Sequence, residues 1–335
     1  MGKFKAYRIF SEEGKIASRL VDMTLDELDP GEVVIKSAYS SINYKDALAA
    51  TGAGKIIRRF PCVGGVDGCG TVVSSTDARF REGDEVIATS YDLGVAHDGG
   101  YAAYMRVPAG WVVPLPKGMS LFESMVLGTA GYTAALAVVR MEHEGLQPAN
   151  GPVIVTGATG GVGSIAVDIL AAAGYHVVAL TGKQAQTDYL KGLGAMEVML
   201  RSSLDLAKVK PLDKATWAGA VDNLGGEVLS WLASTMNVGG TLASIGLAAS
   251  HTFNTTVMPF ILRGVSLLGV DSVNTPMATR QKVWQRLAAD LKPRHLQSMV
   301  TTVELEGMPP VFDRILKGQA RGRTVVKIGG EQPTK

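Results

Sequence analysis

A run of small residues near the middle of the chain follows a short segment suited to a buried strand. Val153–Thr156 is followed after Gly157 by Ala158, Thr159, Gly160, Gly161, Val162 and Gly163. Bare glycine backbone lets a pyrophosphate approach the amide donors at the start of a helix. The run therefore predicts a dinucleotide site made by these six residues. Ala158 stands at the first glycine position, giving Ala-x-Gly-x-x-Gly, so the flanking pattern has to carry the interpretation.

The flanking residues have the pattern of a strand, a helix and a second strand. Ser164–Gly174 has apolar residues at helical spacing and ends at a glycine, and Tyr175–Leu180 is typical of a buried strand. The three elements and the loop fit into about 30 residues, as a βαβ unit should. A glycine-rich turn in another kind of α/β protein is the alternative. The pattern favours a site for a nicotinamide cofactor.

The end of the second predicted strand indicates which cofactor is bound. Enzymes that use NAD place Asp or Glu there, about 20 residues past the glycines, to bind the ribose hydroxyls. This chain has Thr181, Gly182 and Lys183, and Arg201 follows the next predicted strand. A hydroxyl, a backbone amide and cations accept a 2′-phosphate, which a carboxylate would repel. We therefore expect NADPH, although each cation taken singly could be a solvated surface charge.

Composition limits the kind of protein this can be. With 335 residues, 46% of them hydrophobic and 19% charged, the chain is long enough for two folded domains. A formal net charge of +2 gives no reason to expect a nucleic-acid or membrane partner. The two cysteines, Cys62 and Cys69, build neither a disulfide framework nor a metal site, so we expect no metal and a reducing, cytoplasmic location.

The chain divides into three segments by pattern. Residues 1–124 contain short β runs cut by turns, residues 125–263 alternate strands with helices, and residues 264–335 return to a different character, with a predicted strand at 265–270, a helix at 278–291 and a strand at 322–328. A discontinuous first domain that resumes after the nucleotide domain explains this order.

Four motifs in sequence order carry a resemblance to a known family. Ser41–Asp46, Gly64–Gly70, Gly128–Ala134 and the Ala-x-Gly-Gly-Val-Gly loop resemble the zinc-independent quinone oxidoreductase branch of the medium-chain dehydrogenase/reductases. The resemblance covers nearly the whole chain. It implies an α/β protein with a GroES-like β-barrel catalytic domain, residues 1–124 and 264–335, and a Rossmann domain with a doubly wound parallel sheet, residues 125–263.

Further blocks resemble one group within that branch, the acrylyl-CoA reductases. The blocks are Asn43–Leu48, Gly54–Arg58, Thr256–Arg263, Gly269–Val273 and Gly322–Lys327. The resemblance implies reduction of acryloyl-CoA to propionyl-CoA with NADPH, by hydride transfer to Cβ and protonation at Cα. An NADPH-dependent quinone or enal reductase is one alternative. A low-turnover NADPH-binding protein with a structural or RNA-binding role is another.

The resemblance also assigns roles to single residues. Zinc-dependent relatives have a cysteine where this chain has Asn43 and a His-Glu pair where it has Val66-Asp67, which again argues against a metal. The residues implied to lie beside the nicotinamide half of the cofactor are Thr129, Thr133, Asn223, Gly246, Leu247 and the backbone of Asp271, Ser272 and Val273.

Candidate substrate and catalytic residues come from the β domain and the closing strand. Asn43 is expected to orient the substrate. Tyr44 is expected either to donate a proton or to form part of the pocket wall. Asp46 is expected to organise its loop by accepting backbone amides. Arg323 could bind a CoA phosphate, the cofactor phosphate or a carbonyl, and the basic cluster of Lys55, Arg58 and Arg59 could bind CoA or be a solvated face.

The family resemblance further implies a homo-oligomer. Relatives commonly pair the edge strands of their nucleotide domains, and an unpaired edge needs covering. The segment around Thr252–Leu268 is where we expect this contact.

Overall fold

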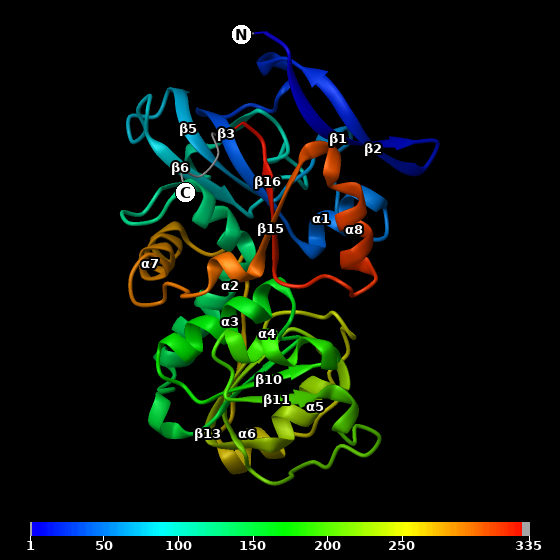
Figure 1. Ribbon diagram of the computed structural model, residues 1–335, viewed down its shortest axis with the longest axis vertical. Coiled ribbons are helices and arrows are strands. Elements are labelled where there is room, and N and C mark those ends of the chain that lie inside the picture. The colour runs from blue at the N-terminus through cyan, green and yellow to red at the C-terminus, as the bar shows by residue number, and fades with distance from the viewer. Residues whose placement is uncertain (1, 330–335) are drawn as a thin grey trace. The chain divides into compact units, whose positions relative to one another are not determined.

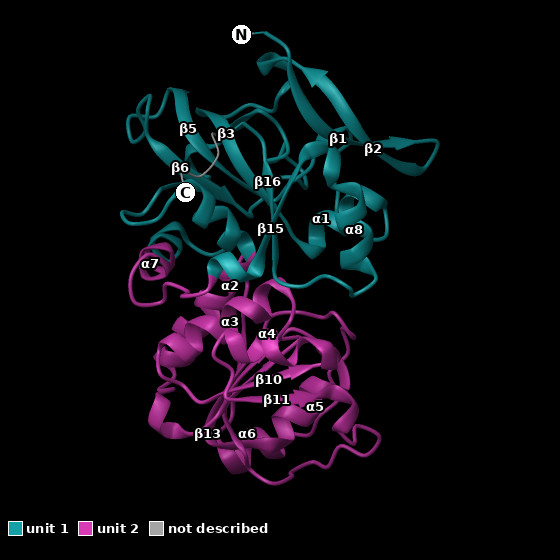
Figure 2. Ribbon diagram, in the orientation of Figure 1, with its two compact units in different colours: residues 1–129, 273–281, 296–335 teal, residues 130–272, 282–295 magenta. Residues whose placement is uncertain are grey.

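The computed structural model describes residues 2–329, which form two compact units. Of the described residues, 2–129, 273–281 and 296–329 form unit 1, and 130–272 and 282–295 form unit 2 (Figure 2). The first unit is therefore built from separated parts of the chain. The first domain is therefore discontinuous, as expected, but its boundaries differ from the expected ones.

Unit 1 is built around two β sheets (Figure 1). A small sheet has the order β2-β1-β4, and a larger one has the order β15-β16-β3-β5-β6-β8, with β7 paired to β3. The strands are β1 (Phe4–Glu12), β2 (Lys15–Met23), β3 (Val33–Ile42), β4 (Cys62–Val63), β5 (Asp67–Ser75), β6 (Glu85–Thr89), β7 (Tyr104–Val107), β8 (Val112–Pro114), β15 (Val300–Glu304) and β16 (Arg323–Lys327).

Two hydrophobic cores hold unit 1 together. The first packs the small sheet against the short helices α1 (Tyr44–Thr51) and α8 (Pro309–Leu316), with Tyr7, Tyr101 and Phe312 in ring contact. The second is formed by alternate apolar residues of β3, β5, β6 and β7, the pattern of strands with one face buried. This packing brings β16 from the end of the chain beside β3, and it thereby places Arg323 next to Ile42 and Asn43.

Unit 2 contains a six-stranded parallel sheet with the order β11-β10-β9-β12-β13-β14. The strand order reverses between β9 and β12, which is the arrangement of the dinucleotide-binding doubly wound fold. The strands are β9 (Val153–Thr156), β10 (Val177–Thr181), β11 (Glu197–Leu200), β12 (Trp217–Asp222), β13 (Met236–Ser244) and β14 (Ser266–Gly269). The helices are α3 (Gly161–Ala172), α4 (Thr187–Gly192), α5 (Gly226–Thr235) and α6 (Met258–Arg263).

The structure corrects the expected return to the first domain at residue 264. Strand β14 pairs in parallel with β13 and so extends the sheet of unit 2. Residues 282–295, which include the end of α7 (Met277–Leu287), also belong to unit 2. The apolar run at 265–270 was assigned correctly as a strand but to the other domain, because a short apolar run does not show which sheet it joins.

Helix α2 (Leu121–His143) is interrupted at Gly128, whose φ of 51° and ψ of −153° lie outside the helical region. Within residues 2–329 it is the one helix long and apolar enough to cross a membrane, with a mean hydropathy of 1.4. Of that apolar stretch, 78% is buried within the protein. The break at Gly128 turns the chain just before Thr129, a residue of the polar network described below.

Candidate active site

In unit 2, the predicted glycine loop joins β9 to the first turn of α3. Gly157 takes the left-handed conformation, with φ of 57°, and its carbonyl accepts a hydrogen bond from the Gly160 amide at 2.9 Å. A Cβ on Gly163 would lie 2.4 Å from the Gly157 oxygen, so only glycine fits there. The sequence interpretation counted Ala158 as the first position of the motif and did not select Gly157, whose positive φ forms the turn.

The expected 2′-phosphate residues lie at the ends of neighbouring strands. Thr181 ends β10, and its hydroxyl accepts a hydrogen bond from the Lys183 amide at 3.0 Å. Thr181 is in register with Leu200, so Arg201 follows β11 at the same edge of the sheet. Arg201 is exposed, and partial burial lowers the pKa of Lys183. The structure therefore brings together the hydroxyl, the amide and the two cations that the sequence analysis singled out.

The next strand ends form the other half of this edge. The Asn223 amide group donates to the Thr156 carbonyl at 2.7 Å, which links the end of β12 to β9. A Cβ on Gly246 would lie 2.5 Å from the Asn223 oxygen, so the two loops touch through glycine. Leu247 beside it is 63% exposed. Buried Asp222, missed by the sequence analysis, accepts from the Thr156 hydroxyl and from the amides of Leu224 and Gly225.

These contacts test whether unit 2 can hold a dinucleotide. At Gly163, in the first turn of α3, the close approach of the Gly157 and Ala158 main chain leaves no room for a side chain. Ala158, Thr159 and Gly163 are buried, whereas Gly160, Gly161 and Val162 are partly exposed. Amide donors at a helix start together with cations at the adjacent strand end fit a phosphorylated dinucleotide.

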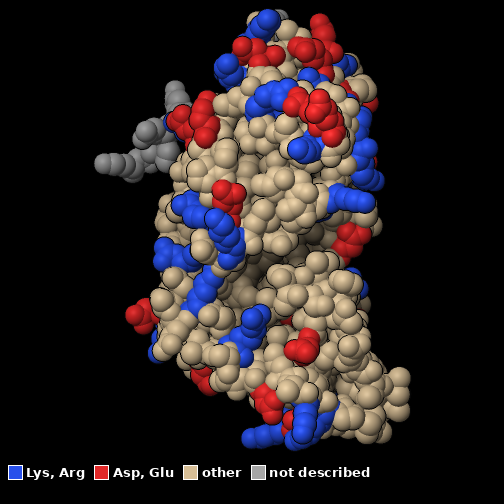
Figure 3. Space-filling view, turned by 90° about the vertical axis from the view of Figure 1, so that its right-hand side faces the viewer, with Lys and Arg blue, Asp and Glu red and all other residues tan. Residues whose placement is uncertain are grey.

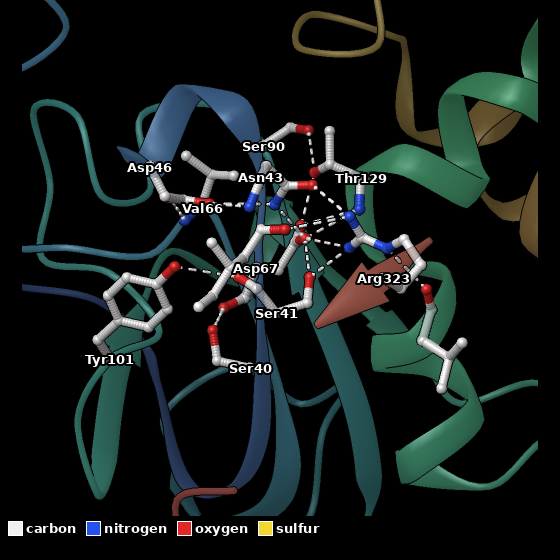
Figure 4. A network of polar contacts seen from close by, with 12 residues as sticks. Ser40, Ser41, Asn43, Asp46, Val66, Asp67, Ser90, Tyr101, Thr129 and Arg323 are labelled. Carbon is white, nitrogen blue, oxygen red and sulfur yellow. Dashed lines mark hydrogen bonds and ion pairs between the residues drawn. The ribbon is translucent and has the colours of Figure 1, made fainter. Parts of the chain in front are cut away.

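Unit 1 contains a buried polar network centred on Asp67 (Figure 4). The fully buried Asp67 carboxylate accepts hydrogen bonds from the Ser41 hydroxyl at 2.5 Å and the Asn43 amide group at 2.7 Å. It also accepts from the Thr129 amide at 3.0 Å and the Thr129 hydroxyl at 2.5 Å. Figure 4 shows these groups converging on the carboxylate from separate segments. Asp67 is a site residue that motif reading did not select, although a lone acid in a glycine-rich strand was a usable indication.

Arg323 balances the charge of this network. Its guanidinium donates to the carbonyls of Val126 and Ile42 at 2.9 and 3.2 Å, and to the Ser41 hydroxyl at 2.8 Å. Its Nη2 lies 3.9 Å from the Asp67 carboxylate. Only 3% of Arg323 is exposed, and burial lowers its pKa. Of the partners left open by the sequence, a CoA phosphate, the cofactor phosphate or a carbonyl, the structure shows carbonyls, those of Val126 and Ile42.

Asn43 and Tyr44 begin helix α1. The Asn43 side chain donates to Asp67 and, at 3.2 Å, to Asp46, while its oxygen accepts from Arg323. Both ends of the Asn43 amide are thus held by the protein, and its role in orienting substrate stays a prediction. Tyr44 directly follows and is 48% exposed. The network therefore fixes the start of α1, where Tyr44 lies.

Gly128 closes the network from the side of α2. A Cβ at this position would lie 2.5 Å from the Asp67 carboxylate and 2.6 Å from the Ser41 hydroxyl. Glycine is required here on two grounds, the positive φ and the close approach. The neighbouring Thr129 can therefore reach Asp67 with both its amide and its hydroxyl, whereas Thr133 lies in unit 2 and is buried.

Asp46 has the organising role expected for it. Its carboxylate accepts from the amides of Asn43 and Val66 at 2.8 and 3.0 Å. Burial, with a smaller contribution from the charge of Asp67, raises the pKa of Asp46 from 3.8 to about 7. The folded protein therefore binds a proton at Asp46 more tightly than the unfolded chain does.

We expect this raised pKa to make the protein less stable as pH rises from about 4 to about 7. The contribution is complete below the unfolded pKa and is lost as pH passes the folded pKa, a change of up to about 4 kcal/mol. Denaturant unfolding of the wild type and Asp46→Asn across this range measures it. The variant should lose the slope, whereas Asp22→Asn on the surface should keep it. Equal slopes in the wild type and Asp46→Asn would contradict the prediction.

The basic cluster expected to bind CoA is partly engaged in ion pairs. Arg58 pairs with Asp92, and Arg59 pairs with Asp29 and lies 3.6 Å from the Asp98 carboxylate. Lys55 is exposed. These pairs neutralise part of the positive charge of the two arginines. On the face drawn in Figure 3, Lys and Arg side chains lie among Asp and Glu side chains, and much of the surface carries neither.

The segment expected to contact the nicotinamide carboxamide is partly exposed. Asp271 is exposed, and Ser272 and Val273 are half-buried. The Val273 carbonyl accepts from Arg280 at 3.1 Å. A polar main-chain segment held in this way can offer donors and acceptors at fixed positions.

Cys62 and Cys69 are both fully buried. Burial raises the pKa of each thiol to about 12, which keeps both protonated at neutral pH. Within residues 2–329, no group of three or more His, Cys, Asp and Glu residues is placed to hold a metal ion.

The strand order of unit 2 and the bare glycine loop define a dinucleotide-binding fold of the kind found in dehydrogenases and reductases. Comparison with known families agrees. Residues 29–117 match the alcohol dehydrogenase GroES-like domain, and residues 161–289 match the domain described as zinc-binding dehydrogenase.

Individual relatives match along nearly the whole chain. YhfP of Bacillus subtilis, named as a quinone oxidoreductase, is 50% identical over 97% of this chain and 99% of its own. The acrylyl-CoA reductase AcuI of Ruegeria pomeroyi is 44% identical over 95% of this chain and 96% of its own. The YhdH oxidoreductase of Salmonella enterica, solved in complex with NADP, has a TM-score of 0.95 at 45% identity, covering 97% of this chain and all of its own.

The chain therefore belongs to the medium-chain dehydrogenase/reductase superfamily of oxidoreductases, as the motif order indicated. The expected pairing of a GroES-like domain with a Rossmann domain is confirmed.

Proposed function

We propose that this protein reduces the α,β double bond of acryloyl-CoA to give propionyl-CoA, with NADPH as the cofactor. The observation that carries the proposal is the 44% identity to the acrylyl-CoA reductase AcuI over 95% of the chain. The site geometry supports it, because unit 2 has a phosphate-binding strand end and unit 1 has a rigid polar network beside Tyr44.

The cofactor site fits NADPH. Thr181, Gly182 and Lys183 stand where NAD enzymes place a carboxylate, and Arg201 follows the neighbouring strand β11 at the same edge of the sheet. YhdH was solved with NADP, whereas YhfP, with a TM-score of 0.96 at 49% identity over 98% of this chain and all of its own, was solved with NAD. Which of the two cofactors this chain prefers therefore depends on the residues at the ends of β10 and β11.

We expect Lys183→Ala and Arg201→Ala each to weaken NADPH binding about 10- to 100-fold, because each removes a charge-assisted contact with the 2′-phosphate. Binding of NADH, which lacks that phosphate, should stay within about twofold of the wild type. Fluorescence titration with both cofactors measures the two affinities. Lys191→Ala, on α4, is the matched control. Equal loss of NADH and NADPH binding would contradict a 2′-phosphate role.

In the proposed reaction, conjugation with the thioester makes Cβ of the substrate electrophilic, and bound NADPH supplies the hydride for that carbon. The chain has to supply a proton to Cα and donors to the thioester oxygen. Tyr44, at the start of α1 and half-exposed, is the proposed proton donor. The start of α1 is held in place by the hydrogen bonds of Asn43 with Asp67 and Arg323. Lys55 is exposed, and it is the cation proposed to contact a CoA phosphate.

The experiment that tests the proposal is the rate of NADPH oxidation with acryloyl-CoA, beside NADH and beside a simple quinone. Fast turnover restricted to NADPH and acryloyl-CoA is the expected result. The 50% identity to YhfP favours a quinone reductase as the second candidate. Turnover with the quinone alone would support that candidate and overturn the acyl-CoA proposal. Shortening CoA to a simple thioester should lower activity, because binding energy from the remote CoA portion is then lost.

We also propose that unit 2 forms a homodimer through the edge of its sheet. Strand β14 is the last strand in the sheet order, and exposed apolar side chains occur on β14 and in the segment that precedes it in the chain. Val257, Ile261, Leu262 and Leu267 are 66%, 71%, 58% and 39% exposed. A second copy paired along β14 would satisfy the open strand edge and cover these side chains together.

A charge in this patch should break the dimer. We expect Ile261→Glu to shift the protein to monomers in analytical ultracentrifugation, because a carboxylate would be desolvated in the interface. Met196→Glu is the matched control, since Met196 is 65% exposed and precedes β11 at the opposite edge of the sheet. The same oligomeric state for the wild type and Ile261→Glu would rule out this interface.

A further inference from the structure

The turn that follows β6 in unit 1 has a backbone conformation that side chains rarely adopt. Ser90 and Tyr91 have φ values of 67° and 51°, both in the left-handed region. Among the described residues other than glycine, Glu13 alone shares a positive φ, and it is exposed in the turn between β1 and β2. Such a conformation costs free energy and persists only where the surroundings hold it.

Several contacts within unit 1 hold this turn against that cost. Arg280 is fully buried, and its Nη1 donates to the carbonyl and the hydroxyl of Thr89 at 3.3 and 3.2 Å. Its guanidinium carbon lies 4.5 Å from the centre of the Tyr91 ring. Tyr91 also stacks on Trp111, with ring centres 5.5 Å apart and an interplanar angle of 8°. The turn is therefore fixed by its neighbours in a conformation that it would not adopt alone.

The side chain that this turn places next to the Asp67 network is that of Ser90. Ser90 is buried, and its hydroxyl is hydrogen-bonded to the Thr129 hydroxyl at 3.1 Å (Figure 4). The Thr129 hydroxyl lies 2.5 Å from the Asp67 carboxylate, which can only accept. Thr129 therefore gives its one hydroxyl hydrogen to Asp67, and Ser90 has to be the donor in its bond with Thr129.

The same carboxylate holds the start of α1. Asp67 accepts from the Asn43 amide group at 2.7 Å, and Asn43 is the residue that precedes Tyr44 at the beginning of the helix. Hydrogen bonds in a chain polarise and strengthen one another. A donor to Thr129 therefore strengthens the bond from Thr129 to Asp67, and it steadies the carboxylate to which Asn43 is bound.

We propose that Ser90 is a positioning residue for the reductase reaction, which acts through Thr129 and Asp67 on the start of α1. Glycine would adopt this backbone without strain but would bring no hydroxyl to Thr129. The strained turn is thus kept because of the donor that it places in the network. The inference rests on the proposed function, because it takes Tyr44, at the start of α1, as the proton donor.

Two substitutions of Ser90 separate the hydroxyl from the strain. Ser90→Ala removes the hydroxyl and keeps the strain, whereas Ser90→Gly removes both. We expect kcat with acryloyl-CoA to fall by the same factor in both variants, about five- to tenfold, since each loses one hydrogen bond. Ser90→Gly should unfold at a higher denaturant concentration than Ser90→Ala, because glycine adopts a positive φ freely. A merely structural role would instead make kcat follow the unfolding midpoint.

Glu13 provides the matched control, because it has a φ of 50° in unit 1 and no part in the polar network of Figure 4. Glu13→Gly should also unfold at a higher denaturant concentration than Glu13→Ala. Both Glu13 variants should keep the kcat of the wild type. Steady-state turnover and denaturant unfolding of the four variants make the comparison.

The outcomes distinguish this inference from the proposed function. Equal losses of kcat in the two Ser90 variants, at different unfolding midpoints, support the positioning role. Unchanged kcat in both, a kcat that follows the midpoint, or equal midpoints overturn it and leave the substrate assignment intact. A wild type that reduces the quinone alone overturns the proposed function, and kcat with the quinone then tests Ser90 by the same comparison.

Discussion

Replacing Asp67 with alanine is expected to destabilise the protein by about 3–5 kcal/mol and to abolish most of its reductase activity. The carboxylate accepts four hydrogen bonds from Ser41, Asn43 and Thr129 and lies beside the buried Arg323 guanidinium. Removal of the carboxylate leaves the buried Arg323 guanidinium without its anionic partner. It also releases Asn43, which precedes Tyr44 at the start of α1.

Denaturant unfolding and steady-state turnover measure the two effects of Asp67→Ala. Asp22→Ala is the matched control, because Asp22 pairs with Lys5 on the surface with about half its side chain exposed. It should change stability by less than about 1 kcal/mol. In a double-mutant cycle, Arg323→Met should cost less in the Asp67→Ala background than in the wild type. Additive losses would show that the two buried charges are not coupled.

Gly163→Ala is expected to give the second large effect, a loss of at least about 1–3 kcal/mol in stability together with NADPH binding that is weakened more than about tenfold. The new Cβ would lie 2.4 Å from the Gly157 oxygen and 2.7 Å from the Ala158 Cα, both main-chain atoms. The loop and the start of α3 must then move apart, which displaces the amides proposed to receive the pyrophosphate.

Gly192→Ala provides the control for this glycine series. Gly192 ends α4, and a Cβ there meets no atom within 4 Å, so stability should be unchanged or slightly raised. Thermal unfolding and cofactor titration of both variants complete the comparison. A Gly163→Ala protein with wild-type affinity for NADPH would show that the loop does not bind the pyrophosphate.

The local elements of the nucleotide unit could be predicted from sequence because they depend on neighbours in the chain. Val153–Thr156 is both the predicted strand and β9, and the helix after Gly163 and the strand ending at Thr181 were placed within a few residues. Their apolar periodicity and glycine positions act over short distances. The motif spacing did not select Gly157, the left-handed glycine of the loop, because it stands one residue before the motif.

The polar network could not be predicted, because its members are brought together by packing. Ser41 and Arg323 are separated by 282 residues, and Asp67 and Thr129 by 62. The sequence selected Asn43 to orient substrate and left a phosphate or a carbonyl open as the partner of Arg323. Only the structure shows that Arg323 is buried and that Asn43 and Arg323 are hydrogen-bonded to each other.

The sequence by itself determined the class of this protein, its dinucleotide loop and the cationic end of its second strand, since each is a property of a few consecutive residues. Only the tertiary structure decided that Asp67 is the centre of the polar network in unit 1, that β14 completes the sheet of unit 2, and that Arg280 is hydrogen-bonded to Val273. Those contacts join residues from distant parts of the chain, and no local pattern records which of them a folded core will bring together.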